Sequence, residues 1–446
     1  MPNPTNASQA FSLARIQGFL SSTYKSQFVR NVAVVASGTA GAQAITMAFA
    51  PIITRLYGPE AFGLQGTFIA IAAVVMPIAA LCYPIAIVLP KKDGDARGIA
   101  RLSAYIALSM TVLAALVLLI AGDLIVELLH LNEIRSYIML IPLVIVFSAW
   151  LQINYHWLIR KKQFKINARV AVLQAFLTNS AKAGIGLFSP QASVLILVYT
   201  LGSGLQAFML SIGIKKTENG NDKDKLLCKT PLRQLAKKYY DFPMYRAPQI
   251  FLNTVSQSIP IIMLAAFFGP ASAGCYGLGK GLLGMPSELI SKSVGDVFYP
   301  RITTAANSGE KLTNLILKAT LGLAAVGFIP FALVIAFGPW LFGFIFGSEW
   351  FLAGEYARWL ALWMFSAFIN RPSVVSMPVL SLQGFFLIYE ILSVVLRIIT
   401  LIIGFYMLKS DILAIMLFSM AGVFLNIAII LLTIYKSLFQ ANIKVA

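Results

Sequence analysis

The sequence predicts an all-α membrane protein with about twelve transmembrane helices, arranged as two pseudo-symmetric six-helix bundles around a central cavity. Three observations predict this class: the composition, the length of the apolar runs and an internal repeat. Apolar residues make up 59% of the 446 residues and charged residues only 12%, and the mean hydropathy is +0.81. A soluble chain of this length needs far more charge to cover its surface and divides into several domains.

The apolar residues fall into runs of about 20, the length at which a helix crosses the hydrocarbon layer of a bilayer. Spans are expected in the first half at 31–57, 62–89, 99–121, 136–158, 167–188 and 191–214. In the second half they are expected at 243–268, 272–298, 311–337, 351–376, 383–408 and 411–435. The predicted divisions are an interfacial N-terminal segment (1–30), a first lobe (31–214), a cytoplasmic linker with an amphipathic helix (215–242), a second lobe (243–435) and a cytoplasmic tail (436–446).

The distribution of charge predicts the orientation in the membrane. The chain has 35 Lys and Arg against 17 Asp and Glu, a formal net charge of +18. In a membrane protein this excess indicates basic cytoplasmic loops rather than nucleic-acid binding. With the N-terminus inside, every cytoplasmic loop but the one near residue 380 is basic, whereas the outer connections hold mainly Arg135 and Lys409 beside acids. We therefore expect cytoplasmic N- and C-termini and an even number of spans.

An internal repeat supports the division into two halves. Residues 53–63 (ITRLYGPEAFG) and 264–274 (LAAFFGPASAG) share a Gly-Pro pair and a later glycine at a constant offset of 211. Two six-helix repeats in the same orientation imply a pseudo-twofold axis along the membrane normal, with a central cleft about which the lobes can rock. The helix after each motif is expected to contain a central proline and to end at another, namely Pro77 and Pro90 or Pro286 and Pro300.

Ionisable side chains inside the apolar runs are the candidate functional residues, because such groups normally face a polar cavity. Intramembrane cations outnumber intramembrane acids, and Lys or Arg side chains bind phosphate oxygens well. A cationic substrate-binding cavity is therefore predicted from Arg55, Lys182, Arg246, Lys280, Lys292, Arg358, Arg371 and Arg397. Its polar lining is predicted from Gln43, Gln249, Asn253 and Gln257. The residues predicted to couple transport to an ion are Glu288, Asp296 and Glu390.

Structural roles for several of these residues stay open. Lys292 and Asp296 lie near the predicted cytoplasmic surface, which their side chains can reach. Arg397 and Glu390 share one face of a helix and can form structural ion pairs with another helix. The side chains of Arg55, Lys182 and Arg358 can reach the outer headgroups.

Several classes of chemistry are excluded by the absence of their motifs. The chain has no GxxxxGK[ST], GxSxG or HExxH pattern. Three cysteines and two histidines provide no disulfide framework and no spacing for a metal site. No cofactor is expected beyond a possible coupling to an H⁺ or Na⁺ gradient, and the protein is not expected to be an enzyme.

Two segments resemble the polysaccharide exporter family, which includes the Wzx-type flippases of O-antigen. The first is 31–90 with its continuation, carrying ITRLYGPEAFG and YPIAIVLPKKDGDA; the second is 248–300, with FFGPASAGCYGLG and VFYP. The resemblance implies the two-lobed fold of multidrug and toxic-compound extruders (MATE-like) and of lipid II flippases. It also implies translocation of undecaprenyl-pyrophosphate-linked oligosaccharides to the periplasmic leaflet of the bacterial inner membrane by alternating access, for O-antigen, capsule or exopolysaccharide. The implied partners are this lipid-linked substrate, membrane lipids, a polysaccharide polymerase and a chain-length regulator, and no nucleic acid.

Two alternative functions make different demands on the sequence. A cation-coupled multidrug antiporter of the same fold should have a dominant acid in its first-half helices, where this chain has almost none within the apolar runs. A membrane-embedded saccharide polymerase or glycosyltransferase usually needs a substantial periplasmic loop. The longest predicted outer connection here runs only from about Gly122 to Arg135.

Overall fold

The computed structural model describes residues 27–128, 131–217, 230–380 and 382–443. Within these ranges all regular structure is helical. The long helices of the first half are α2 (Gln27–Leu56), α3 (Pro59–Ala79), α5 (Asp93–Leu128), α7 (Ile141–Arg160), α8 (Phe164–Gly186) and α9 (Ala192–Thr217). Those of the second half are α11 (Ala247–Phe268), α12 (Pro270–Asn307), α13 (Leu312–Phe346), α14 (Phe351–Ile369), α16 (Gln383–Ile403) and α17 (Asp411–Ile443).

Short elements connect the long helices. In the first half they are α4 (Tyr83–Ala86), the 3₁₀ turn η1 (Asn132–Ile134) and α6 (Arg135–Ile138). The linker contains α10 (Leu232–Lys238), and the π-helical segment η4 (Phe242–Arg246) leads into α11. In the second half they are the 3₁₀ turn η5 (Ser348–Trp350), α15 (Arg371–Ser376) and the π-helical segment η6 (Gly404–Leu408).

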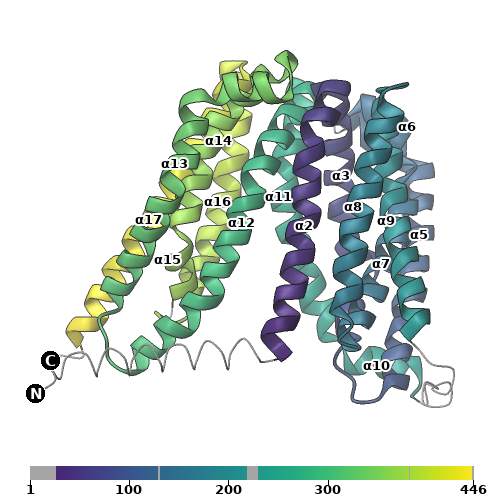
Figure 1. Cartoon of the computed structure of the whole chain (residues 1–446), viewed down its shortest axis with the longest axis horizontal. Helices are drawn as coiled ribbons and strands as arrows, with labels where there is room; N and C mark the ends of the chain where they lie inside the picture. The colour runs from purple at the N-terminus through teal and green to yellow at the C-terminus, as the bar shows by residue number, and fades with distance from the viewer. Residues whose placement is uncertain (1–26, 129–130, 218–229, 381, 444–446) are drawn as a thin grey trace, which may run out of the picture.

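The predicted fold class is confirmed. Eight of the described helical segments are long and apolar enough to cross a membrane. The remaining long helices α2, α8, α12 and α14 lie among them in the same two bundles (Figure 1) and carry more polar sequences. A helix that faces only lipid or an apolar core has no need of polar side chains, so these four helices are where a polar interior surface is expected.

The two bundles lie side by side, with α2 to α9 in one and α11 to α17 in the other (Figure 1). Helix α3 packs against both α11 and α12 and so joins the bundles at the centre. We call the end of the molecule with the turns at Gly58, Gly269 and Gly347 the hairpin end, and the end with α10 the linker end. Helices α2 and α12 approach each other at the hairpin end and diverge toward the linker end (Figure 1).

The two Gly-Pro motifs form equivalent helix starts through different backbone conformations. Pro59 and Pro270 each occupy the first position of a helix, where the missing N–H costs nothing. Gly269 has φ +86°, which favours glycine, whereas Gly58 has φ −68°, which any residue can adopt. The turn between α11 and α12 therefore depends on its glycine, and the matching turn between α2 and α3 does not.

The later glycines of the repeat make the closest contact between the bundles. A Cβ atom on Gly63 would overlap the carbonyl oxygen of Pro270 in the other bundle. A Cβ atom on Gly274 would in turn overlap the carbonyl oxygen of Pro59. The contact is reciprocal between the two repeats, and it brings the backbones of α3 and α12 together at the hairpin end. Only glycine permits this approach.

The prediction of one continuous span over 62–89, and of helix ends at Pro90 and Pro300, was wrong. Helix α3 ends at Ala79, and Leu81 and Cys82 have left-handed backbones (φ 48° and 58°) before α4 begins. Helix α12 continues past Pro300 to Asn307. A proline removes a single helical hydrogen bond, so a long, well-packed helix can accommodate it as a bend.

The linker helix α10 docks beneath the first bundle. Leu235 is buried beside Tyr83 and Trp157, and the Tyr83 hydroxyl donates to the carbonyl of Ala236 at 3.2 Å. The predicted boundaries of linker and lobes stay a prediction, and the predicted interfacial segment 1–30 lies almost wholly outside the described residues, as do 218–229 of the linker.

Arg160 holds the connection between α4 and α5 in place at the linker end. Its guanidinium pairs with Asp93 at 2.8 Å and donates to the carbonyls of Ile87, Val88 and Pro90, and its side chain is only 9% exposed. Removing this group takes one donor from three carbonyls and one of two cationic partners from Asp93.

We expect Arg160→Gln to lower the free energy of unfolding by about 2 kcal/mol, because one substitution removes an ion pair and several carbonyl contacts. Thermal unfolding in detergent measures the change. The matched control is Arg135→Gln, since Arg135 pairs with Asp123 at an exposed site (60% and 75% exposed) and such pairs contribute little. An equal effect of both substitutions would contradict this role for Arg160.

Candidate functional site

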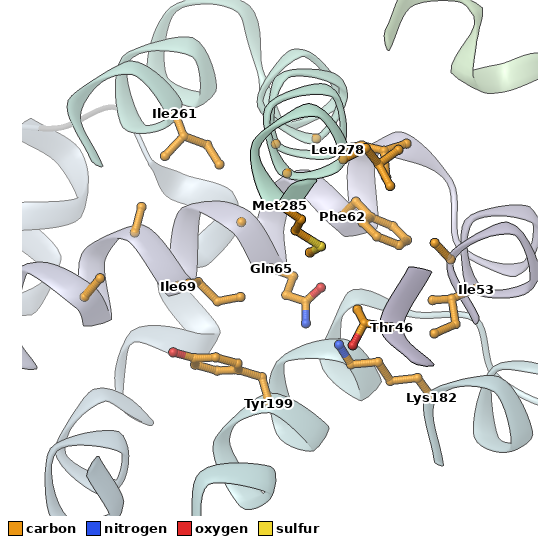
Figure 2. A pocket seen from close by; sticks show the side chains of 18 of the residues that line it. Thr46, Ile53, Phe62, Gln65, Ile69, Lys182, Tyr199, Ile261, Leu278 and Met285 are labelled. Carbon is orange, nitrogen blue, oxygen red and sulfur yellow. The ribbon is translucent and has the colours of Figure 1, made fainter. Parts of the chain in front are cut away.

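A cavity of about 500 Å³ lies between the two bundles, lined by residues of α2, α3, α8, α9, α11 and α12 (Figure 2). The volume is in the range of small-molecule binding sites. Most of the wall is apolar and includes Met47, Ile53, Phe62, Leu278 and Met285. The polar residues that line it are Thr46, Gln65, Asn179, Lys182, Tyr199, Gln257 and Ser258.

Lys182 is the one charged side chain among the residues that line this cavity. Its ammonium group is directed into the space that Thr46 and Gln65 also face (Figure 2). Tyr57 fixes the backbone at this point, since its hydroxyl donates to the carbonyl of Lys182 at 2.9 Å and its ring packs on Gly186. Among the residues that the structure describes, no acid pairs with Lys182. The cavity therefore offers a single unneutralised positive charge on the side of the first bundle.

Buried amides hold the neighbouring helices in register. Gln65 is 6% exposed and donates to the carbonyl of Leu195 at 3.1 Å, which ties α3 to α9. Asn179 donates to Thr46 Oγ1 at 3.3 Å and to the carbonyl of Ala175 at 2.7 Å. These bonds tie α3 to α9 and α8 to α2 by polar contacts, which resist sliding in a membrane where apolar packing alone is permissive.

Lys280 lies at the edge of the cavity on the side of the second bundle. Its ammonium group is 3.4 Å from both the backbone and the side-chain oxygen of Gln257, a residue that lines the cavity. It also lies 5.7 Å from the ring centre of Tyr276. In the described part of the chain no acid forms an ion pair with Lys280, and Glu288, two turns along α12, is the acid that acts electrostatically on its charge.

Arg397 and Lys280 both contact an aromatic cluster formed by Tyr276, Trp363 and Phe418. The guanidinium carbon is 5.0 Å from the ring centre of Trp363 and 5.9 Å from that of Phe418. Phe418 packs edge-to-face on both Tyr276 and Trp363. Arg397 Nε is buried and has no hydrogen-bond partner among the described atoms. The ring faces stabilise a cation here without neutralising its charge.

The predicted polar stripe of α11 leads from the cavity toward the linker end. Gln249, Asn253 and Gln257 are spaced by four residues and all are exposed, and Arg246 donates to Gln249 Oε1 at 2.9 Å. Residues at this spacing share one helix face. The stripe therefore joins a cavity residue to an exposed cation outside the cavity.

Arg55 and Arg358 do not line the cavity. Arg55 reaches across the hairpin end from α2 and donates to the carbonyls of Phe344 at 2.7 Å and Ile345 at 3.3 Å. Arg358 stays within the second bundle, where it donates to the carbonyl of Ile335 at 2.9 Å and lies 3.4 Å from Glu355. Both guanidinium groups donate to backbone oxygens. The sequence pattern alone cannot distinguish an arginine bound in this way from one that lines the cavity.

The remaining predicted residues are dispersed. Arg371 lies beside Gly295 and lines a separate open pocket of about 350 Å³, and its Nε is buried without a partner. Gln43 is outside the cavity lining, and its Oε1 is also buried without a partner. Glu288 and Glu390 are exposed. Lys292 and Asp296 lie on α12, but their side chains lie outside what the structure describes.

Sequence reasoning missed Gln65, Asn179 and Tyr199 as cavity residues. Each interrupts an apolar run with one polar group, so a search for uncharged polar residues inside the spans would have found them. The predicted residues that the structure does bring to the cavity or its edge are Lys182, Gln257 and Lys280.

Comparison with known proteins agrees with this geometry. Residues 52–355 match the family described as polysaccharide biosynthesis protein, which is more than half of the chain. The succinoglycan biosynthesis transport protein ExoT of Rhizobium meliloti (strain 1021) is 21% identical over 349 residues, 73% of this chain and 63% of ExoT. The chain thus spans less than two thirds of the length of this curated relative.

Two solved structures show the same fold. An inward-facing multidrug resistance MATE family transporter of the MOP superfamily matches with a TM-score of 0.69 and 13% identity, covering 88% of this chain and 93% of that one. The lipid II flippase MurJ, in an inward closed conformation, matches with a TM-score of 0.64 and 14% identity, covering 92% and 91%. None of these relatives is named as an enzyme, in agreement with the prediction. With its helical fold, its central cavity and the match over residues 52–355, the chain belongs to the polysaccharide biosynthesis protein family of membrane proteins.

Proposed function

We propose that this protein is a flippase that moves undecaprenyl-pyrophosphate-linked oligosaccharides from the cytoplasmic to the periplasmic leaflet of a bacterial inner membrane. The observation that carries the proposal is the placement of two cations without an ion-pair partner, Lys182 in the lining and Lys280 at the edge, on opposite bundles of one cavity. No Asp or Glu is among the residues that line this cavity. Such a site favours an anion and disfavours the cationic drugs that an antiporter of this fold would carry.

The chemistry of the substrate explains the need for such a cavity. A pyrophosphate crossing the hydrocarbon layer unaided would lose its hydration, at a prohibitive free-energy cost. Ammonium groups pair with phosphate oxygens, and the amides of Gln65 and Asn179 lie nearby to replace water around the sugars. The polyprenyl tail, being apolar, stays in the surrounding lipid.

The contacts at the hairpin end support one state of an alternating-access cycle. Besides Arg55 and the two glycines, Trp350 Nε1 donates to the carbonyl of Thr54 at 2.9 Å, and the Trp350 and Phe62 rings pack edge-to-face. These contacts hold the two bundles together at one end, while α2 and α12 diverge at the other (Figure 1). With the linker end in the cytoplasm, as the charge distribution predicts, this is the state that receives substrate from inside.

Net transport in one direction needs a source of free energy. An H⁺ or Na⁺ gradient acting through Glu288, Asp296 or Glu390 is one source of direction, and consumption of the product by a polymerase with its chain-length regulator is another. In this proposal both termini lie in the cytoplasm, as the charge distribution predicts, and the destination polymer is O-antigen, capsule or exopolysaccharide.

Reconstituted protein tests the proposal directly. Purified chain in proteoliposomes is given undecaprenyl-pyrophosphate-linked N-acetylglucosamine on one leaflet, and its appearance on the other is followed with a membrane-impermeant sugar-modifying enzyme. We expect translocation well above that of protein-free vesicles, and no proton-driven efflux of ethidium. Ethidium efflux without lipid translocation would show a multidrug antiporter instead, and formation of glycosidic bonds would show an enzyme.

A further inference from the structure

Four prolines inside the central helices recur between the two halves of the chain. Pro51 in α2 and Pro77 in α3 match Pro260 in α11 and Pro286 in α12 at a constant spacing of 209 residues. All four helices contribute residues to the central cavity. Because these prolines recur in both repeats and lie in helices that surround the cavity, we infer that they have a role at the cavity.

A proline within a helix leaves one carbonyl without its usual partner. It has no N–H, so the carbonyl four residues earlier loses its helical hydrogen bond. The carbonyls affected in this way by Pro51, Pro77 and Pro286 belong to Met47, Ala73 and Leu282, all of which line the cavity. Within a bilayer such a group needs a replacement donor, from a neighbouring side chain, water or a ligand.

Elsewhere in this chain a side chain supplies the replacement. Pro339 in α13 removes the helical donor for Ile335, and Arg358 Nε donates to that carbonyl at 2.9 Å. The carbonyls at the cavity lack such a side-chain donor in the part of the chain that the structure describes. Among the described residues, no side chain is seen to donate to the carbonyls of Met47, Ala73 or Leu282. Because the three residues line the cavity, a ligand bound there is a source of the replacement donor.

We propose that the carbonyls of Met47, Ala73 and Leu282 form an acceptor subsite for the hydroxyl groups of a saccharide. Sugar hydroxyls are hydrogen-bond donors, which a backbone carbonyl accepts whatever the side chain. The lysines cannot accept these hydroxyl hydrogens, because an ammonium group only donates. In this proposal the cavity has two subsites: the cations bind the phosphate groups of the lipid-linked saccharide, and the carbonyls bind its sugar. The inference rests on the proposed function and adds the sugar subsite to it.

Three variants at two positions separate the carbonyl from the bend in the helix. Pro77→Ala restores an N–H for the Ala73 carbonyl. The α-hydroxy analogue of alanine at position 77, which makes a backbone ester, has the same side chain but no N–H, so it keeps the carbonyl free. Pro330→Ala is the matched control, because Pro330 acts on the carbonyl of Val326, which is 61% exposed on a helix outside the cavity.

Binding to the purified full chain is measured by thermophoresis with two probes, undecaprenyl pyrophosphate and the same lipid bearing one N-acetylglucosamine. We expect Pro77→Ala to weaken binding of the sugar-bearing lipid about 3- to 10-fold, the effect of one net hydrogen bond, and to leave binding of the sugar-free lipid unchanged. The ester variant and Pro330→Ala should bind both lipids like the unaltered protein. Pro286→Ala should repeat the effect of Pro77→Ala in the second bundle.

Three results would overturn the inference while the proposed function stands: equal binding of both lipids by the unaltered chain, equal loss of both lipids in Pro77→Ala, or an ester variant that behaves like Pro77→Ala. Failure of the unaltered chain to bind either lipid would instead refute the proposed function, and the sugar subsite with it.

Discussion

Replacing Lys182 with glutamine is expected to reduce translocation of a pyrophosphate-linked saccharide by about 10- to 100-fold. A hydrogen bond to a charged group contributes roughly 1.5–3 kcal/mol, and this is the one charged side chain in the cavity lining. Glutamine keeps much of the length and polarity and removes only the charge. Lys182→Arg should retain much of the activity, since it keeps the charge with a different geometry.

The control for this experiment lies on the same helix. Lys165 is exposed on α8 and lines a groove with α2 outside the cavity, so Lys165→Gln removes an equal charge without touching the site. Initial rates in proteoliposomes, at matched protein content, measure all three variants. Equal rates for Lys182→Gln and Lys165→Gln would contradict the placement of the phosphate beside Lys182.

Adding a single methyl group at Gly63 is expected to abolish transport and to open the hairpin end. The new Cβ would overlap the backbone oxygen of Pro270, which cannot move aside as a flexible side chain would. The closed state then costs several kcal/mol more (roughly 5), enough to move most molecules out of it. Gly274→Ala should act in the same way through Pro59, and the double variant should be little worse than either single one.

Distances between spin labels report this change directly. Labels at Glu60 and Ser348, exposed positions on the two sides of the contact, should be close together in the unaltered protein and farther apart in Gly63→Ala. Gly322→Ala is the matched control, because no atom lies within 4 Å of a Cβ at that position. An unchanged distance distribution in Gly63→Ala, or normal transport, would show that the two bundles do not close through these glycines.

Arg55 is a cation within an apolar run that holds the two bundles together at the hairpin end and does not line the substrate cavity. It lies within the repeated motif, yet its guanidinium spans the hairpin end to the last turn of α13. Helix C-termini carry partial negative charge and unpaired carbonyls, so an arginine from the other bundle is well suited to this position. The Gly-Pro repeat and Arg55 together form a contact surface between the bundles at the hairpin end, and Lys182 and Lys280 lie at the cavity between the bundles.

Much of the fold was predictable because hydropathy and helical period are local properties. Twelve apolar runs predicted twelve long helices, and the 211-residue offset predicted the pairing of Gly63 with Gly274 as equivalent positions. The break after Ala79 was not predictable, since it depends on left-handed residues, Leu81 and Cys82, at a point where α4 packs on the distant α10.

The sequence by itself determined the class of protein, the two repeats and the set of buried cations, since each follows from the free energy of placing side chains in a bilayer. Only the tertiary structure decided which of those cations share a cavity. A buried arginine or lysine can be satisfied by a carbonyl, an aromatic face or a bound anion, and which of these it meets depends on how each helix is rotated and on what the other bundle presents. That is why Arg55, Arg358 and Arg397 found partners in the protein, whereas Lys182 was left facing the cavity.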